Sequence, residues 1–285
     1  MFGDFPLQGK IVAITGGGSG IGLAFAKRCH SQGSRVVIGD LKLSPQAQSF
    51  VDESRDSRTC LFTQCDVAKW SDLQGLIDFA RREFGDVPDV YCPCAGVFEP
   101  VKQENHYQSV AINVEHPLKF TRLAIRALVG MNKKGVVLLV ASVAGLYGTY
   151  AVPMYCATKH AIVGFVKSLS LADELEGIKV VGICPGIVGT PLWDNRPKTM
   201  ENYGAYGAID PLTPEEVAIS MGALVQEGKH QGGTVFLHGN GKKEVVVSGT
   251  RIGNTPFVET AERIHAIIQR ERGTHPTSQP CRSGK

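Results

Sequence analysis

The sequence predicts a single-domain α/β fold, a doubly wound parallel sheet of about seven strands with helices on both faces. Short apolar runs of strand length alternate with segments of helical periodicity along most of the 285 residues. A glycine-rich turn joins the first apolar run to the first helical segment. No internal repeat interrupts the alternation. Polar or glycine-rich motifs follow several of the runs, so we expect the active site beyond the carboxyl ends of the strands.

Seven apolar runs are predicted to be buried strands. They are residues 10–14, 35–39, 59–64, 89–92, 135–141, 179–184 and 234–237. Helical patterns are expected near residues 20–29, 73–85, 107–131, 153–171 and 213–228. A capping box at Thr213-Pro214-Glu215-Glu216 marks the start of the helix near residues 213–228, and Gly85 marks the end of the helix near residues 73–85.

We assign residues 1–240 to a nucleotide-binding catalytic domain of the Rossmann type and residues 241–285 to a C-terminal extension. In the extension, Thr255-Pro256 can start a helix with one apolar stripe that ends at Gly273. This helix is expected to dock on the body or on a neighbouring subunit. The residues from Thr274 onward are polar and are expected to be disordered.

The composition excludes several functional classes. The formal net charge is +3 and the basic residues are spread among acids, so neither nucleic acid nor a membrane is an expected partner. The segment Met1 to Lys10 lacks the layout of a signal peptide and no apolar run is long enough to cross a bilayer, so we expect a cytoplasmic protein. The eight cysteines lack zinc-ligand spacing and are expected to be free thiols, so no metal is predicted.

The turn after the first predicted strand has the features of a phosphate-binding loop. It reads Thr15-Gly16-Gly17-Gly18-Ser19-Gly20-Ile21-Gly22. Glycines let the backbone approach a phosphate closely, and the helix that follows presents unpaired N–H groups and the positive end of its dipole. The alternative is a glycine-rich turn without a ligand.

The residue that ends the second predicted strand indicates which dinucleotide is bound. Asp40 follows the glycine turn by some twenty residues, where an acid accepts hydrogen bonds from the adenosine ribose and repels a 2′-phosphate. Neither Leu41 nor Ser19 brings a positive charge, which favours NAD over NADP. Lys42 could swing back toward a phosphate, and Asp40 could instead be a simple turn residue.

A tyrosine and a lysine after the fifth predicted strand form a candidate acid–base pair. Tyr155 and Lys159 are one helical turn apart, so the phenol and the ammonium share a face. A free tyrosine has a pKa of about 10, and a nearby cation lowers the pKa by favouring the phenolate. Ser142, which follows the strand, could orient a substrate oxygen. Such a set suits proton transfer to or from an alcohol or a carbonyl, although a lone Tyr-x-x-x-Lys is common on helices.

The predicted helix of residues 107–131 is interrupted by Pro117. Because proline has no N–H, the carbonyl of Asn113 loses its helical partner, and this carbonyl and the amide could together anchor a water molecule. A proline kink without a chemical role is equally consistent with the local sequence.

Together these motifs resemble the short-chain dehydrogenase/reductase family over roughly residues 8–237. The glycine motif matches at Thr15, Gly16, Gly20 and Gly22, and the family's catalytic tetrad falls on Asn113, Ser142, Tyr155 and Lys159. The resemblance implies that Tyr155 is the general acid or base, that Lys159 lowers its pKa and holds the nicotinamide ribose, and that Asn113 positions a relay water. It also implies a homodimer or homotetramer.

The same resemblance extends the cofactor site to segments after other strands. It places an adenine-contacting acid at Asp66 and a carboxamide contact at Thr190. Where the family has an asparagine that steadies the central sheet, this chain has Cys94. The complete predicted cofactor set is Thr15, Gly16, Gly18, Ser19, Gly20, Ile21, Gly22, Asp40, Leu41, Asp66, Val67, Cys94, Ala95, Gly96, Tyr155, Lys159, Pro185, Gly186, Val188 and Thr190.

The predicted reaction is NAD-dependent interconversion of a secondary alcohol and a ketone on a fairly apolar small molecule. A steroid, a prostanoid or a polyketide-like compound would fit the apolar residues near the site. The candidate substrate contacts are Val97, Ser142, Tyr147, Trp193, Met200, Tyr203 and Tyr206. These aromatics could equally pack a lid. A non-catalytic dinucleotide sensor or scaffold and a dehydratase or epimerase are the alternative functions.

Overall fold

The computed structural model describes residues 2–98, 107–193, 210–239 and 241–247, together with Ala266. The chain divides into two compact units, Met1–Gly249 and Thr250–Lys285. The predicted helix of residues 255–273 and the end from Thr274 lie outside the described residues, apart from Ala266. The predicted domain boundary after residue 240 stays a prediction.

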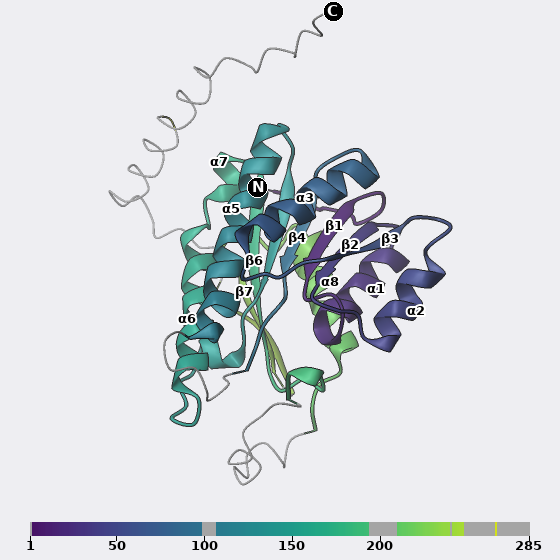
Figure 1. Cartoon of the computed structure of the whole chain (residues 1–285). Helices are drawn as coiled ribbons and strands as arrows, with labels where there is room; N and C mark the ends of the chain where they lie inside the picture. The colour runs from purple at the N-terminus through teal and green to yellow at the C-terminus, as the bar shows by residue number, and fades with distance from the viewer. Residues whose placement is uncertain (1, 99–106, 194–209, 240, 248–265, 267–285) are drawn as a thin grey trace, which may run out of the picture. The chain divides into compact units, whose positions relative to one another are not determined.

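Figure 1 shows one sheet with helices on both faces. Its eight strands have the order β3-β2-β1-β4-β5-β6-β7-β8. The strands are β1 (Ile11–Thr15), β2 (Arg35–Asp40), β3 (Cys60–Gln64), β4 (Val90–Pro93), β5 (Gly135–Val140), β6 (Ile178–Pro185), β7 (Val235–Gly239) and β8 (Lys242–Val247). All seven predicted strands are confirmed within one or two residues, and they pair in parallel.

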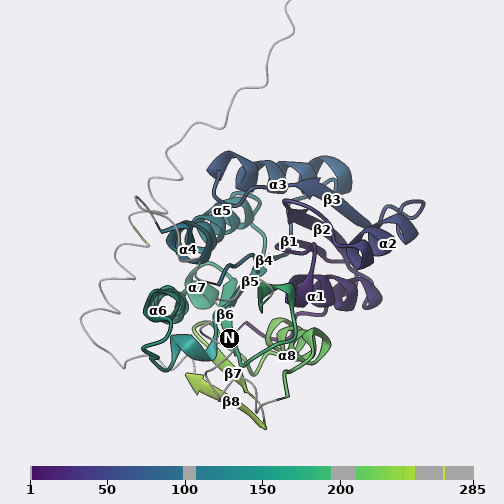
Figure 2. The same cartoon turned by 60° about the horizontal axis from the view of Figure 1, so that its bottom comes forward.

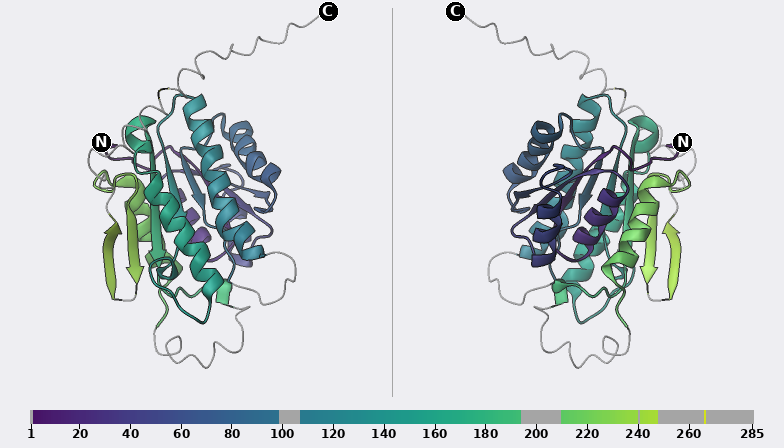
Figure 3. Two further views of the ribbon diagram at one scale, coloured as in Figure 1. Left: turned by 90° about the vertical axis from the view of Figure 1, so that its left-hand side faces the viewer. Right: turned by 90° about the vertical axis from the view of Figure 1, so that its right-hand side faces the viewer.

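The eighth strand was not predicted. β8 pairs antiparallel with β7 after the tight connection at Gly241, whose φ is +75°. Figure 3 shows this hairpin at the outer edge of the sheet. β8 falls within the segment assigned to the C-terminal extension, so part of that segment belongs to the sheet.

Two layers of helices cover the sheet, as Figure 2 shows. One face carries α1 (Gly20–Ser31), α2 (Pro45–Glu53) and α8 (Pro214–Gln226); the other carries α3 (Trp70–Phe84), α5 (His116–Gly130) and α6 (Pro153–Ser168). Each layer packs its own cluster of buried apolar residues against the strands. Because both faces are covered, the inner strands are apolar along nearly their whole length.

Local signals in the sequence set two helix ends. At the start of α8, the Thr213 hydroxyl accepts the N–H of Glu216 at 3.2 Å, and the Glu216 carboxylate accepts the N–H of Thr213 at 2.8 Å. α3 ends at Gly85, whose φ of +84° suits a residue without a Cβ atom. Both predicted ends are confirmed. α2 was not predicted, although Ser44 caps it and Pro45 begins it.

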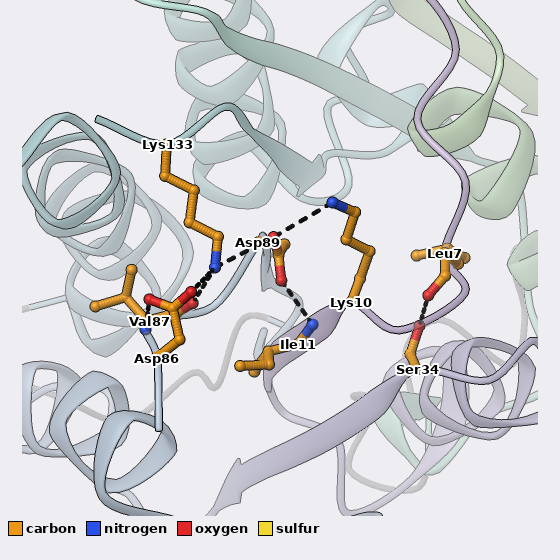
Figure 4. A network of polar contacts seen from close by, with 8 residues as sticks. All are labelled: Leu7, Lys10, Ile11, Ser34, Asp86, Val87, Asp89 and Lys133. Carbon is orange, nitrogen blue, oxygen red and sulfur yellow. Dashed lines mark hydrogen bonds and ion pairs between the residues drawn. The ribbon is translucent and has the colours of Figure 1, made fainter. Parts of the chain in front are cut away.

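An ion-pair network fixes the amino ends of β1, β4 and β5 (Figure 4). The Asp89 carboxylate accepts the backbone N–H of Ile11 at 2.8 Å, and it lies 3.2 Å from Lys133 Nζ and 3.6 Å from Lys10 Nζ. Lys133 Nζ also lies 2.7 Å from the Asp86 carboxylate. These charges lie at the amino ends of the strands, away from the carboxyl ends where the site is expected.

Candidate functional site

A cavity of about 480 Å³ lies at the carboxyl ends of the strands, as the topology predicts. Its size falls within the usual range for a ligand site. Segments that follow β1, β2, β3, β4, β5 and β6 line it. The lining residues of the predicted cofactor set are Gly16, Ser19, Gly20, Ile21, Gly22, Asp40, Leu41, Asp66, Val67, Cys94, Ala95, Gly96, Tyr155, Lys159, Pro185, Gly186, Val188 and Thr190.

The glycine loop packs closely against its own backbone and against Ala95. Gly16 has a φ of +68°, and a Cβ atom there would lie 2.5 Å from Ala95 Cα. A Cβ atom at Gly22 would collide with the carbonyl oxygen of Gly16. Ser19 is the N-cap of α1, but its side chain makes no capping hydrogen bond, and the first turn of α1 has no acidic residue. The first N–H groups of α1 therefore face the loop without a capping side chain, as an anion-binding turn requires.

Asp40 is fixed by the loop that it borders. Its carboxylate accepts the N–H of Gly18 at 2.9 Å and that of Leu41 at 2.7 Å. A Cβ atom at Gly18 would lie only 2.8 Å from Asp40 Oδ2. With the Lys42 N–H, 3.5 Å from Oδ1, three backbone donors hold the carboxylate at the edge of the cavity, and Oδ2 keeps a lone pair for a further donor. Gly18 itself supports Asp40 and does not line the cavity.

Tyr155 and Lys159 lie on the first turns of α6 with Pro153 at its start, as predicted. Tyr155 is 8 % exposed and Lys159 is 6 % exposed, and both line the cavity. Lys159 Nζ lies 5.6 Å from the centre of the Tyr155 ring and donates to the carbonyl of Val140 at 3.0 Å. The pair is therefore within electrostatic reach and mostly shielded from water.

Burial lowers the pKa of Lys159 to about 8, against the opposing effect of the nearby thiols of Cys94 and Cys184. The ammonium therefore remains mostly charged at neutral pH, where it favours the phenolate form of a neighbouring tyrosine. Ser142 follows β5 and lines the same cavity, and its hydroxyl accepts the N–H of Ala144 at 3.2 Å. The hydroxyl proton remains available to a substrate oxygen.

Asn113 lies in a π-helical turn, η1 (Ala111–Glu115), between the short helix α4 (Gln108–Val110) and α5. Pro117 occupies the first turn of α5, so the predicted interruption takes the form of a π-turn, a feature frequent at functional sites. The Asn113 side chain donates to the Val97 carbonyl and accepts the Val97 N–H, both at 2.9 Å. The amide fixes the segment after β4, and Asn113 does not line the cavity; its role in anchoring a water stays a prediction.

An aromatic group covers the other side of Tyr155. The Phe98 ring centre lies 4.9 Å from that of Tyr155 and 5.0 Å from that of Trp193. The Trp193 indole N–H donates to the Val188 carbonyl at 2.8 Å, which orients the ring. Phe98 was missed by the sequence analysis because nothing local distinguishes it. The apolar lining that the sequence analysis missed includes Phe98, Ile112, Val140, Ala141, Val143, Ala144, Val152, Ile187 and Leu192.

Four of the predicted substrate contacts lie among the described residues, and three of these reach the cavity. Val97, Ser142 and Trp193 line it. Tyr147 is 64 % exposed and lies outside the lining, because it follows the turn η2 (Val143–Gly145) on the surface. Met200, Tyr203 and Tyr206 lie outside the described residues.

The chain matches the model of the short chain dehydrogenase family over residues 10–201. The chain belongs to the short-chain dehydrogenase family. A human relative, 15-hydroxyprostaglandin dehydrogenase [NAD(+)], is 33 % identical over 206 residues that cover 70 % of this chain and 76 % of the relative. Human 3-hydroxyacyl-CoA dehydrogenase type-2 is 31 % identical over 255 residues, which are 82 % of this chain and 95 % of the relative.

A solved structure supports the fold of this short-chain dehydrogenase independently. Levodione reductase is similar with a TM-score of 0.72 and 23 % identity, over 82 % of this chain and 97 % of that chain. Family membership and fold together make the protein an oxidoreductase with a doubly wound α/β fold. Across the residues that the structure describes, no helix has the length and apolarity needed to cross a membrane. No group of three metal-ligand side chains gathers in the same described ranges.

Proposed function

We propose that the protein is an NAD(H)-dependent oxidoreductase that interconverts a secondary alcohol and a ketone, with Tyr155 as the general acid and base. One observation carries the proposal. A single cavity is lined both by the glycine loop with Asp40 and by Tyr155, Lys159 and Ser142. A dinucleotide bound along this cavity would bring its reactive ring to the side of the acid–base pair.

The residues of the cavity fit NAD. The uncapped start of α1 and the glycine loop suit the pyrophosphate, and the Asp40 carboxylate suits the two hydroxyls of the adenosine ribose. A 2′-phosphate would place more negative charge beside Asp40, so NADP is disfavoured. One relative is named as an NAD(+) enzyme, which supports the same choice. When bound, NAD would supply the hydride acceptor or donor at its nicotinamide ring.

The protein's own groups would handle the proton. In the oxidative direction, the Tyr155 phenolate takes the hydroxyl proton of the alcohol while the Ser142 hydroxyl holds the same oxygen. The Lys159 ammonium stabilises the phenolate because burial weakens the screening between the two groups. In the reductive direction, Tyr155 returns the proton to the oxygen of the forming alcohol.

The aromatic lining favours an apolar substrate. Phe98 and Trp193 present ring surface beside Tyr155, and Leu192 and Val152 extend that surface. The two relatives are named for a hydroxyprostaglandin and a hydroxyacyl-CoA, which supports a hydroxylated substrate with an apolar body. We further propose a homodimer or homotetramer, from the family resemblance.

Replacement of the proposed acid–base residue tests the function. Tyr155→Phe is expected to lower turnover of secondary alcohols with NAD by at least about 100-fold and to leave NADH binding intact, because it removes only the titrating hydroxyl. Tyr150→Phe is the matched control, since Tyr150 is 96 % exposed and should retain wild-type turnover. The assay follows NADH absorbance over alcohols graded from 2-butanol to 2-decanol and a hydroxysteroid. Wild-type turnover by Tyr155→Phe would refute the assigned role.

A further inference from the structure

His116 is buried where the glycine loop meets the π-turn that carries Asn113. Its side chain is fully buried. Nε2 lies 2.9 Å from the Thr15 hydroxyl oxygen, and Nδ1 lies 3.0 Å from the carbonyl oxygen of Ile112. The ring therefore connects the end of β1 with the π-turn η1, two segments about a hundred residues apart in the chain.

The chemistry of its two partners fixes the direction of both hydrogen bonds. A carbonyl oxygen can only accept, so His116 Nδ1 carries the proton and donates to Ile112. Burial lowers the pKa of His116 to about 4, and the nearby Lys159 ammonium acts in the same direction, so the ring is neutral at physiological pH. Nε2 is then an acceptor, and the Thr15 hydroxyl must donate to it.

Thr15 is the last residue of β1, and the conformation of the glycine loop starts from it. The Thr15 carbonyl accepts the N–H of Cys94 at 3.2 Å, and the next residue, Gly16, donates to Gly39 at 2.8 Å. The backbone at Thr15 and Gly16 is thus held by Cys94, which follows β4, and by Gly39 of β2, and the Thr15 side chain is held by its hydrogen bond to His116. Ile112 lines the cavity, and Thr15 directly precedes Gly16, which also lines it, so the His116 bridge joins two segments of the cavity wall.

The two strands beside Thr15 offer no strong side-chain acceptor. Gly39 of β2 and Pro93 of β4 pair with Thr15 and have no polar side chain, and Cys94, which follows β4, has only a thiol, a weak hydrogen-bonding group. A strong side-chain acceptor for the Thr15 hydroxyl must therefore come from another element. His116, at the start of α5, supplies it.

We propose that His116 is a positioning residue for the cofactor site, which holds the start of the glycine loop against the π-turn through the Thr15 hydroxyl. This inference rests on the proposed binding of NAD. It predicts that loss of the hydrogen bond weakens NADH affinity in addition to any effect on stability. His116 does not line the cavity, so its effect would be transmitted through Thr15 and Ile112.

A double-mutant cycle on NADH binding tests the proposal. His116→Phe and Thr15→Val are each expected to raise the Kd for NADH roughly three- to tenfold, the range for loss of one buried neutral hydrogen bond. Once one partner is missing, removal of the other should change the Kd by less than about twofold. Thr121→Val is the control, because its buried hydroxyl donates to the Pro117 carbonyl at 2.7 Å on the same helix but away from the loop. It should lower stability and leave the Kd unchanged.

A conservative pair keeps the test decisive if His116→Phe does not fold. His116→Gln can place an acceptor near the position of Nε2 and should keep the Kd within about twofold, whereas His116→Asn reaches only the position of Nδ1 and should weaken binding like His116→Phe. The positioning role alone would be overturned if the double variant raised the Kd for NADH by the product of the two single effects. It would also be overturned if Thr121→Val raised the Kd as much as His116→Phe does. A wild-type protein that does not bind NADH would overturn this role and the proposed function together.

Discussion

The buried neutral His116 should make the stability of the protein depend on pH in a way that one substitution removes. The ring has a pKa of 6.5 in the unfolded chain and about 4 in the folded protein. The unfolded state therefore takes up the proton first as the pH falls, so the stability present above pH 6.5 is lost progressively down to about pH 4. The full shift of 2.5 units corresponds to about 3.4 kcal/mol, and about 2 kcal/mol of it is lost by pH 5.

The assay is the free energy of unfolding in guanidinium chloride at pH 7, 6 and 5. At pH 7, His116→Phe should be less stable than the wild type by about 1–2 kcal/mol, because the Thr15 hydroxyl loses its partner. Because phenylalanine cannot titrate, the variant should not share the loss of stability in acid, and its stability relative to the wild type should rise by about 2 kcal/mol between pH 7 and pH 5. The comparison is needed because the pKa values of His230 and His238 are also lowered by burial and act in the same direction. His160→Gln is the control, since His160 is exposed and bonds the Cys156 carbonyl at 2.9 Å in the same way that His116 bonds Ile112. Parallel pH curves for wild type and His116→Phe would refute the reasoning.

Three further predictions concern other parts of the molecule. Lys159→Met should lower turnover at least about 100-fold and yet raise the free energy of unfolding at pH 7 by about 2 kcal/mol. In the wild type, the buried Lys159 ammonium destabilises the folded state below pH 8, and this destabilisation disappears as the pH rises toward 10.5. Turnover and guanidinium unfolding measured on one preparation check both effects. Asp40→Asn should lower the ratio of the Kd for NADPH to the Kd for NADH about tenfold, because the amide does not repel a 2′-phosphate. An unchanged ratio would contradict the role of the charge. Asp89→Ala should cost about 2–3 kcal/mol in guanidinium unfolding, because it leaves the Ile11 N–H and the Lys133 ammonium without a shared acceptor; a loss under 0.5 kcal/mol would contradict this.

Most of the fold could be predicted because its signals are local. Each of the first seven strands is a short apolar run, and the capping box at Thr213 and the terminal Gly85 lie within a few residues of the helix ends that they set. β8 was missed because its run, Lys242–Val247, starts with charges and lies on the edge, where only β7 supports it. α2 was missed because only Ala47 and Phe50 of its residues are buried, which leaves a weak apolar stripe.

The candidate site shows the same division. Residues that act through a spacing, such as Tyr155 and Lys159, could be predicted from the sequence because one helical turn places them together. Phe98 and His116 could not be predicted, because each contacts a residue on a segment far away in the sequence. The histidine three positions after Asn113 was visible in the sequence, but nothing nearby indicates that its ring meets Thr15.

The most direct test of the central claim is a fluorescence titration of the purified protein with NADH and NADPH side by side. The account predicts saturable binding of NADH, with a Kd at least about tenfold lower than that of NADPH, because the proposed ribose ligand, the Asp40 carboxylate, would repel a 2′-phosphate. Tighter binding of NADPH would contradict the cofactor choice. Absence of binding by both dinucleotides would contradict the assignment of the cavity itself.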